Sequence, residues 1–195
     1  MSSLIVGDDG RPRCAWAGSD AEYQRYHDEE WGTALHGDRA LFEKLSLEGF
    51  QAGLSWITIL RRRPTFRIAF RDFDIDAVAA FDARDVERLM ADPGIIRNRL
   101  KVDATISNAR VTQHLLRGHP GALDELIWSF APPPRDHAPA SFAELPAATS
   151  ESTALSTALK KLGYRFVGPT TMYAMMQSGG LVDDHVAGCW RSSYA

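Results

Sequence analysis

Apolar residues recur at helical spacing along most of the chain, and this periodicity limits the folds that the chain can adopt. Between residues 99 and 116, for example, Val102, Ile106 and Ala109 share one helical face. Long Val, Ile and Thr alternation and hairpin dipeptides, which are typical of strands, are nearly absent. With 195 residues the chain is long enough to bury one sizeable core. The sequence therefore predicts an all-α fold, with a single domain over residues 13–195.

Glycines, prolines and capping residues divide this pattern into segments. Residues 1–12 are polar and contain two glycines and a proline, so we expect a flexible N-terminal extension, extended or disordered. Asp38 is expected to cap one helix. Ser55 is expected to cap a short helix that ends in the arginine triplet and Pro64.

Glu48 is a charged residue on an apolar helical stripe. Leu41, Leu45 and Ala52 form the stripe and Glu48 is its i+7 member, so the periodicity directs a carboxylate into the interior. A lone buried charge is costly unless something pairs with it. Two glycines and a serine follow within seven residues, and Trp56 comes just after this bend. The pattern indicates a binding pocket; a Glu at the edge of a core helix, solvated or bonded to an arginine, is the alternative.

Two Cys/His couples near opposite ends of the chain suggest a metal site. His185 and Cys189 lie at i and i+4 and would face one side of a helix, which suits two ligands of one zinc ion. Cys14 and His27 form the second couple. If the couples meet, they complete a closed tetrahedral Cys₂His₂ site, which is structural rather than catalytic. Free buried thiols are the alternative.

A helix, a Pro-Gly turn and a second helix are predicted over residues 84–116. The Gly94 turn and the amides that open the second helix can hold a phosphate, and Arg97, Arg99 and Lys101 add positive charge beside them. The net charge of −3 argues against a strongly cationic nucleic-acid binder, but backbone amides and a few local cations are sufficient for phosphate contacts. An ordinary αα-hairpin is the alternative.

Aromatic residues at helical spacing accompany Glu48 in the sequence. Rings at this spacing are more often part of a core than of a ligand site. However, a carboxylate among ring faces is what recognition of a flat, cationic, hydrogen-bonding ligand needs, because the rings stack on it and the carboxylate accepts from its N–H groups. The rings concerned are Trp16, Tyr23, Tyr26, Trp31 and Trp56.

Several function classes are disfavoured by the sequence. A run of 18 apolar residues and a secretory signal are both absent, so we expect a cytoplasmic protein that does not span a membrane. With only two cysteines, a disulfide framework is not expected. A Ser-His-Asp order, a Gly-rich phosphate loop and a His-Glu-x-x-His motif do not stand out.

Several motifs, in order from about residue 13 to 190, resemble the 3-methyladenine DNA glycosylase I family. The resemblance implies a helix-hairpin-helix DNA repair fold, all-α, with two helical lobes around a cleft. It also implies base-excision repair: removal of 3-methyladenine from alkylated double-stranded DNA, leaving an abasic site without strand cleavage. We expect the protein to act as a monomer. The motifs are Arg13-Cys14-Ala15-Trp16, the segment Tyr26 to Gly32, the segment Leu47 to Ile57, Asp92 to Arg97, Ala158 to Lys161, Phe166-Val167-Gly168, and Asp184-His185-Val186 with Gly188-Cys189.

The resemblance also implies roles for individual residues. Cys14, His27, His185 and Cys189 would bind one structural zinc ion that joins the two ends of the chain. The other implied roles are contact with the excised base by the catalytic residues Glu48 and Tyr26, stacking by Trp56, lining of the pocket by Trp16 and Tyr23, and insertion into the opened DNA by Gly53, Leu54 and Ser55.

The chain departs from the related glycosylases at two places. Many helix-hairpin-helix glycosylases carry a catalytic Asp about twenty residues beyond the hairpin, whereas residues 111–117 here contain no carboxylate and Asp124 is expected to cap a helix. Phe50 stands where a Gln is more usual, and we expect it to alter the rim of the pocket. Two rival functions remain open on the sequence: a module that binds damage without cutting, and a zinc hydrolase that uses the Cys/His set as an open catalytic site.

Overall fold

Nine α-helices and one short two-stranded sheet make up the described part of the chain, residues 2–194 of a computed structural model. Three short 3₁₀ turns, at Ala15–Ala17, Arg71–Phe73 and Phe142–Glu144, connect them. The strands are β1 (Leu4–Val6) and β2 (Pro12–Cys14), and the helices are α1 (Ala21–Glu29), α2 (Asp38–Gln51), α3 (Trp56–Ala69), α4 (Ile75–Ala79), α5 (Ala83–Ala91), α6 (Arg99–Leu115), α7 (Ala122–Trp128), α8 (Ser150–Leu162) and α9 (Pro169–Ser178).

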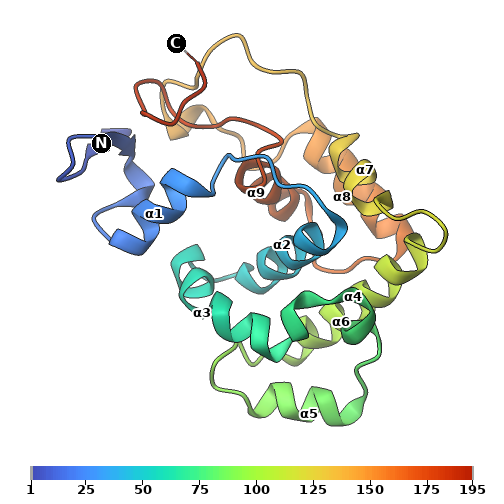
Figure 1. Cartoon of the computed structure of the whole chain (residues 1–195). Helices are drawn as coiled ribbons and strands as arrows, with labels where there is room; N and C mark the ends of the chain where they lie inside the picture. Colours follow the sequence, from blue (N-terminus) through green and yellow to red (C-terminus); the bar gives the residue numbers. More distant parts are fainter. Residues whose placement is uncertain (1, 195) are drawn as a thin grey trace.

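Helix α2 occupies the centre of the molecule. Figure 1 shows α3 to α6 on one side of it and α8 and α9 on the other, with the two chain termini at the same end of the molecule. Helix α4 packs against α6, α8 packs against α9, and α2 contacts α3, α6, α7 and α9. Its residues from Lys44 to Phe50 are all buried, because neighbours cover it on several sides. Within residues 2–194, no helix has both the length and the apolar character needed to cross a membrane.

The N-terminal residues form a hairpin, which the all-α prediction did not include. Strands β1 and β2 pair antiparallel, with Leu4 opposite Cys14 and Val6 opposite Pro12. The segment that we expected to be an extended or disordered lead-in is thus extended and paired over Leu4–Val6. The fold is therefore mostly helical rather than all-α. The hairpin lies against the C-terminal segment, where the Trp190 amide donates to the Pro12 carbonyl at 2.9 Å.

The sequence predicts that Asp38 caps the helix that carries Glu48, but the structure shows that it does not. Asp38 is the first residue of α2 and Gly37 is its N-cap, with a φ of 95° that favours glycine. The Asp38 carboxylate instead accepts from the backbone amides that open α7, those of Gly121 at 2.7 Å and Leu123 at 3.0 Å. Asp124 of α7 accepts in return from the Gly37 amide at 2.5 Å. The two helix starts therefore cap each other across 83 or more residues, which local sequence patterns do not reveal.

Helix α3 continues past Pro64, which the sequence had marked as its end. Proline inside a helix removes one backbone hydrogen bond and costs about 3 kcal/mol. Beyond Pro64, however, Phe66 and Ala69 are buried in the core. Burying a large aromatic side chain contributes about 1.5–3 kcal/mol, so tertiary packing offsets the local penalty.

Phe50 belongs to the hydrophobic core and does not form the rim of a pocket, contrary to expectation. It is fully buried, with its ring centroid 4.7 Å from that of Phe66 and 5.8 Å from that of Phe70. The next residue, Gln51, faces the cavity described below.

Candidate active site

A cavity of about 230 Å³ lies between α1, α2, α9 and the start of α3. It contains the five residues for which the sequence predicted contact with a base, so the structure brings them together from four elements, the Ala15–Ala17 turn, α1, α2 and α3. Its lining is Trp16, Tyr23, Tyr26, Trp31, Glu48, Gln51, Trp56, Phe142, Ala174, Gln177 and Ser178. A second cavity of about 240 Å³ adjoins it, and Trp56 and Ser178 line both.

Glu48 is buried at the inner wall of this cavity. Its side chain is only 2% exposed. The Ser178 hydroxyl donates to Glu48 Oε1 at 2.9 Å, and the Lys44 ammonium lies 3.6 Å from the same oxygen. Burial raises the pKa of Glu48 above its ordinary value, and the nearby Lys44 charge and Ser178 hydroxyl oppose the rise. The carboxylate is therefore paired within the protein, whereas the sequence argument had left it unpaired.

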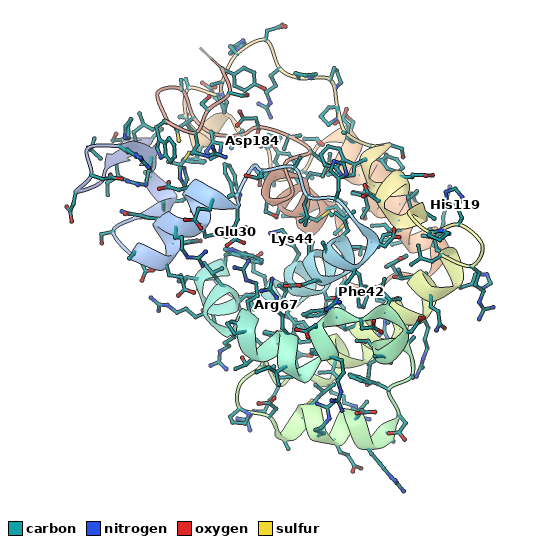
Figure 2. All side chains as sticks on the ribbon, in the orientation of Figure 1. Glu30, Phe42, Lys44, Arg67, His119 and Asp184 are labelled. Atoms are coloured by element: carbon teal, nitrogen blue, oxygen red, sulfur yellow. The ribbon has the colours of Figure 1, made fainter. Side chains whose placement is uncertain are left out.

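Lys44, like Ser178, contacts Glu48 but is not among the site residues predicted from the sequence. Its ammonium donates to the Tyr26 hydroxyl at 3.1 Å and lies 4.6 Å from the centre of the Trp56 ring. It faces the second cavity, and Figure 2 shows it close to Glu30 where α1, α2 and α3 converge. The available signal was its position four residues before Glu48, which places the two side chains on the same helical face.

Aromatic rings form the remaining walls of the base-sized cavity. The Trp16 ring packs edge-on against Tyr23 at 5.1 Å between centroids, and Tyr26 lies 5.6 Å from Trp56. Burial, with the Glu48 charge next, raises the pKa of Tyr26 well above its ordinary value, so its hydroxyl stays protonated. Trp56 Nε1 is buried without a hydrogen-bond partner among the described residues. A flat ligand could stack here and meet the Tyr26 and Trp56 donors and the Glu48 acceptor.

The two Cys/His couples meet at one point beside this cavity. Cys14, His27, His185 and Cys189 are all buried, and their ligand atoms lie within 4.8 Å of one another. The Sγ–N distances are 3.4 Å for Cys189 and His27 and 3.6 Å for Cys14 and His185. Tetrahedral bonds of about 2.3 Å to sulfur and about 2.0–2.1 Å to nitrogen place such atoms about 3.5 Å apart. The residues present therefore fit a tetrahedral metal ion.

Neighbouring polar groups hold both imidazoles in the orientation that metal binding requires. His27 Nδ1 lies 2.8 Å from Asp28 Oδ1, and His185 Nε2 lies 3.2 Å from the Trp31 carbonyl, so the other nitrogen of each ring faces the sulfurs. Burial would raise the pKa of Asp28, but hydrogen bonds from Arg13 and His27 outweigh it and lower that pKa, which keeps the carboxylate charged. Such a shell is typical of metal-ligating histidines.

The chain between His185 and Cys189 forms a turn instead of the expected helix. The Cys189 amide donates to the Val186 carbonyl at 2.9 Å, and Gly188 has a φ of 84°. This tight turn returns Cys189 Sγ to within 3.6 Å of His185 Nδ1. The predicted proximity of the two side chains therefore holds, but the predicted helix is wrong.

The predicted insertion loop is exposed between α2 and α3. Gly53, Leu54 and Ser55 all face solvent, and Leu54 is one of the exposed large apolar residues of the chain. Gly53 has a φ of 82°, which a residue with a side chain adopts only with strain. An exposed leucine on a tight turn beside a cavity is suited to contact with another molecule.

The predicted phosphate contacts around residues 94–101 are only partly available. Arg97 and Arg99 are exposed. The Gly94 amide, however, donates to Asp92 Oδ1 at 2.7 Å, so it is not free. Lys101 is buried, and its ammonium donates to the carbonyls of Phe50 at 2.8 Å and Ala52 at 2.6 Å. Lys101 therefore satisfies the end of α2, because helix C-termini leave carbonyls without partners, and its assignment as a DNA contact is wrong.

This position of Lys101 predicts a loss of stability in Lys101→Met. The variant leaves two carbonyls at the end of α2 unsatisfied, so we expect the free energy of unfolding to fall by about 2–3 kcal/mol. Urea denaturation followed by circular dichroism measures it. Arg97→Met, which removes the same charge from an exposed position, should change stability by no more than about 0.5 kcal/mol. Equal effects of the two substitutions would contradict the helix-capping role.

Known methyladenine glycosylases resemble most of the chain. The family described as Methyladenine glycosylase matches residues 16–192. "DNA-3-methyladenine glycosylase 1" of Escherichia coli (strain K12) is 47% identical over 182 residues, which are 91% of this chain and 95% of that protein. A crystal structure of 3-methyladenine DNA glycosylase I superposes with a TM-score of 0.88 at 45% identity, covering 92% of this chain and 99% of that one. A Staphylococcus aureus structure that describes 3-methyladenine recognition has a TM-score of 0.87 at 33% identity, covering 94% and 97%.

Proposed function

The chain belongs to the methyladenine glycosylase family, hydrolases of N-glycosyl bonds, and we propose that its pocket around Glu48 releases 3-methyladenine from alkylated double-stranded DNA. The observation that carries this proposal is a buried carboxylate at the wall of an aromatic cavity of about 230 Å³. Cavities for drug-sized ligands span about 300–1,000 Å³, so this one suits a single base. The reaction leaves an abasic site and is the first step of base-excision repair.

The proposed chemistry uses the charge of the damaged base. Methylation at N3 makes adenine a cation, which already weakens the glycosidic bond, so the enzyme supplies only a modest part of the barrier. Glu48 accepts from the exocyclic amine, the Tyr26 hydroxyl bonds to the base, and Trp56 stacks on it. As the bond to the sugar breaks, its electron pair stays with the base, which leaves as a neutral molecule. Water then adds to the sugar cation, and one proton of that water passes to solvent. No carboxylate near residues 111–117 is then required to activate the leaving group.

The same geometry supports hydrolysis without strand cleavage. Strand cleavage by a bifunctional glycosylase needs an amine that attacks the sugar. The nearest amine to Glu48 is that of Lys44, which is paired with Glu48 and Tyr26 and lines the second cavity behind Trp56. We therefore assign no covalent role to it.

Base flipping is the proposed route by which the target reaches the pocket. Turning a nucleotide out of the duplex costs a few kcal/mol, and least for a damaged base. Leu54, exposed on the turn between α2 and α3, would fill the space left in the DNA stack, and the exposed Arg97 and Arg99 would contact phosphates.

A structural zinc ion is the proposed occupant of the Cys₂His₂ cluster. Cys14, His27, His185 and Cys189 would hold it, and a closed four-ligand site supplies cross-linking rather than catalysis. We propose in addition that residues 13–195 form a single domain and that the protein acts as a monomer in the cytoplasm. Sedimentation of the protein alone and with a duplex measures the stoichiometry.

One experiment tests the function against its rivals. The protein is incubated with methylated duplex DNA, with and without a chelator, and the released bases are identified by chromatography. We expect free 3-methyladenine and intact strands carrying abasic sites. A module that only binds damage releases no base. A zinc hydrolase loses activity on metal removal while its fold survives, whereas a structural zinc ion predicts that the fold loosens first.

A further inference from the structure

Lys44 lies immediately behind the two side chains to which we assign base contacts. Its ammonium reaches Tyr26 Oη at 3.1 Å and Glu48 Oε1 at 3.6 Å, and it lies over the Trp56 ring at 4.6 Å. The Lys44 side chain is only 10% exposed. A buried ammonium is costly unless paired, so this arrangement is a specific one rather than a solvated surface contact.

The direction of the hydrogen bond to Tyr26 follows from the chemistry of lysine. An ammonium has three donors and no acceptor, so the Tyr26 oxygen must accept from Lys44. The Tyr26 hydroxyl proton then points away from Lys44 and is free to donate into the base cavity, which Tyr26 lines. In the same way, the positive charge beside Glu48 favours its ionised form, which only accepts.

We propose that Lys44 is a positioning residue that fixes the polarity of the base pocket, with Tyr26 as donor and Glu48 as acceptor. This inference rests on the proposed function and deepens it. On the edge that carries N7, 3-methyladenine presents an amine donor beside a ring-nitrogen acceptor, whereas 7-methylguanine presents the O6 acceptor beside a methylated N7 that accepts no hydrogen bond. A pocket with one donor and one obligatory acceptor matches the adenine edge and repels the guanine oxygen. Lys44 thereby selects methylated adenine over methylated guanine.

Residues on or next to three packed helices supply the charged and polar groups around Lys44 and Glu48. Tyr23 and Tyr26 of α1, and Glu30 just after that helix, face the pair, as do Arg63 of α3 and Ser178 of α9. Burial lowers the pKa of Lys44, and the Glu48 and Glu30 charges oppose this while Arg63 adds to it. Because Arg63 is itself ion-paired with Glu30, its charge is largely compensated. The Glu48–Lys44 pair is therefore the principal charge balance at the pocket.

Lys44→Met tests the proposal through the pH profile of excision. Burial raises the pKa of Glu48. Without the ammonium only the Ser178 hydrogen bond opposes that rise, so the pKa of Glu48 increases further. Because the ionised carboxylate is the active form, the acidic limb of the profile should move to higher pH by about one unit or more. On the acidic limb, below the apparent pKa of both proteins, the rate of the variant should be about tenfold lower than that of the wild type, and it should approach the wild-type rate at alkaline pH.

A second measurement reads the base selectivity directly. A protonated Glu48 can donate to the guanine oxygen, so the ratio of released 3-methyladenine to 7-methylguanine should fall about tenfold in Lys44→Met on the acidic limb of the profile. Lys44→Arg keeps the charge, has the adjoining cavity of about 240 Å³ for its larger head group, and should restore both readouts. Lys161→Met, which removes an exposed lysine, should change neither.

The outcomes separate this proposal from the function on which it rests. If the wild-type protein releases no 3-methyladenine, the proposed function is wrong. If it does, and Lys44→Met keeps the wild-type pH profile and selectivity, the role of Lys44 is wrong. If Lys44→Met does not fold, Lys44→Gln replaces it, because this neutral side chain still donates to Tyr26. Loss of the charge alone should then shift the acidic limb to higher pH. An unshifted limb would overturn the proposal.

Discussion

Glu48→Gln is expected to abolish excision of 3-methyladenine while leaving the fold and DNA binding intact. The amide is nearly the same size and keeps an acceptor for Ser178, but it carries no charge to balance a cationic base. Its NH₂ group also adds donors where the base presents its own amine. Loss of one preorganised electrostatic contact in a dry site typically costs about 10²–10³ in rate, and we expect a loss in this range or larger.

Single-turnover release from methylated DNA measures this effect, and a melting curve and a duplex-binding isotherm establish that the variant is folded. Glu43→Gln provides the matched control. It makes the same chemical change on the same helix, but Glu43 pairs with Arg67 and lines the second cavity. The control should excise at the wild-type rate. Wild-type excision by Glu48→Gln would remove Glu48 from the mechanism.

Features of the site that depend on local periodicity were predictable from the sequence. The stripe through Leu41 and Leu45 correctly predicted that Glu48 is buried, because positions i, i+4 and i+7 share one helical face. Ala52, the last member of that stripe, is exposed because α2 ends at Gln51. The periodicity therefore failed where the helix ended, since helix boundaries depend on capping contacts as well as on pattern.

Features that depend on distant packing were not predictable. A lysine on a helix normally reaches water with its charged end, so the i, i+4 spacing of Lys44 and Glu48 did not by itself indicate a buried pair. Only the packing of α1 and α9 over α2 encloses its ammonium with Tyr26 and Glu48. The prediction for Lys101 was wrong for the same reason. Its charge suggested phosphate binding, whereas the carbonyls to which it donates lie 49 and 51 residues away in the sequence.

The Cys₂His₂ cluster links the two ends of the chain to the pocket. Two of its ligands come from the first 27 residues and two from residues 185–189, so a bound ion closes most of the chain into one loop. The pocket ring of Trp16 packs 5.3 Å from His27, and that of Trp31 packs 4.7 Å from His185. The metal ligands therefore support the part of the cavity wall formed by Trp16 and Trp31, and loss of the ion should disturb the packing of these two rings.

Removal of the metal ion is therefore expected to lower stability by a large amount and to reduce activity only as a consequence. The isolated protein should contain about one zinc ion per chain, because two buried sulfurs and two oriented imidazoles match its tetrahedral preference. Metal binding energy becomes folding energy when the unfolded chain lacks the site. In Cys189→Ser we expect loss of zinc and a fall in Tm of at least about 10 °C, since 1 kcal/mol corresponds to about 2–4 °C in a chain of this size.

Double substitution distinguishes a shared metal site from two separate buried thiols. Cys14→Ser and Cys189→Ser each remove the same ion, so the double variant should melt close to either single variant instead of showing the sum of their effects. Calorimetry together with elemental analysis measures this, and zinc added back to chelator-treated wild-type protein should restore its Tm. Additive losses, or wild-type protein that melts unchanged after complete removal of metal, would show that the four side chains are a packed cluster with no structural ion.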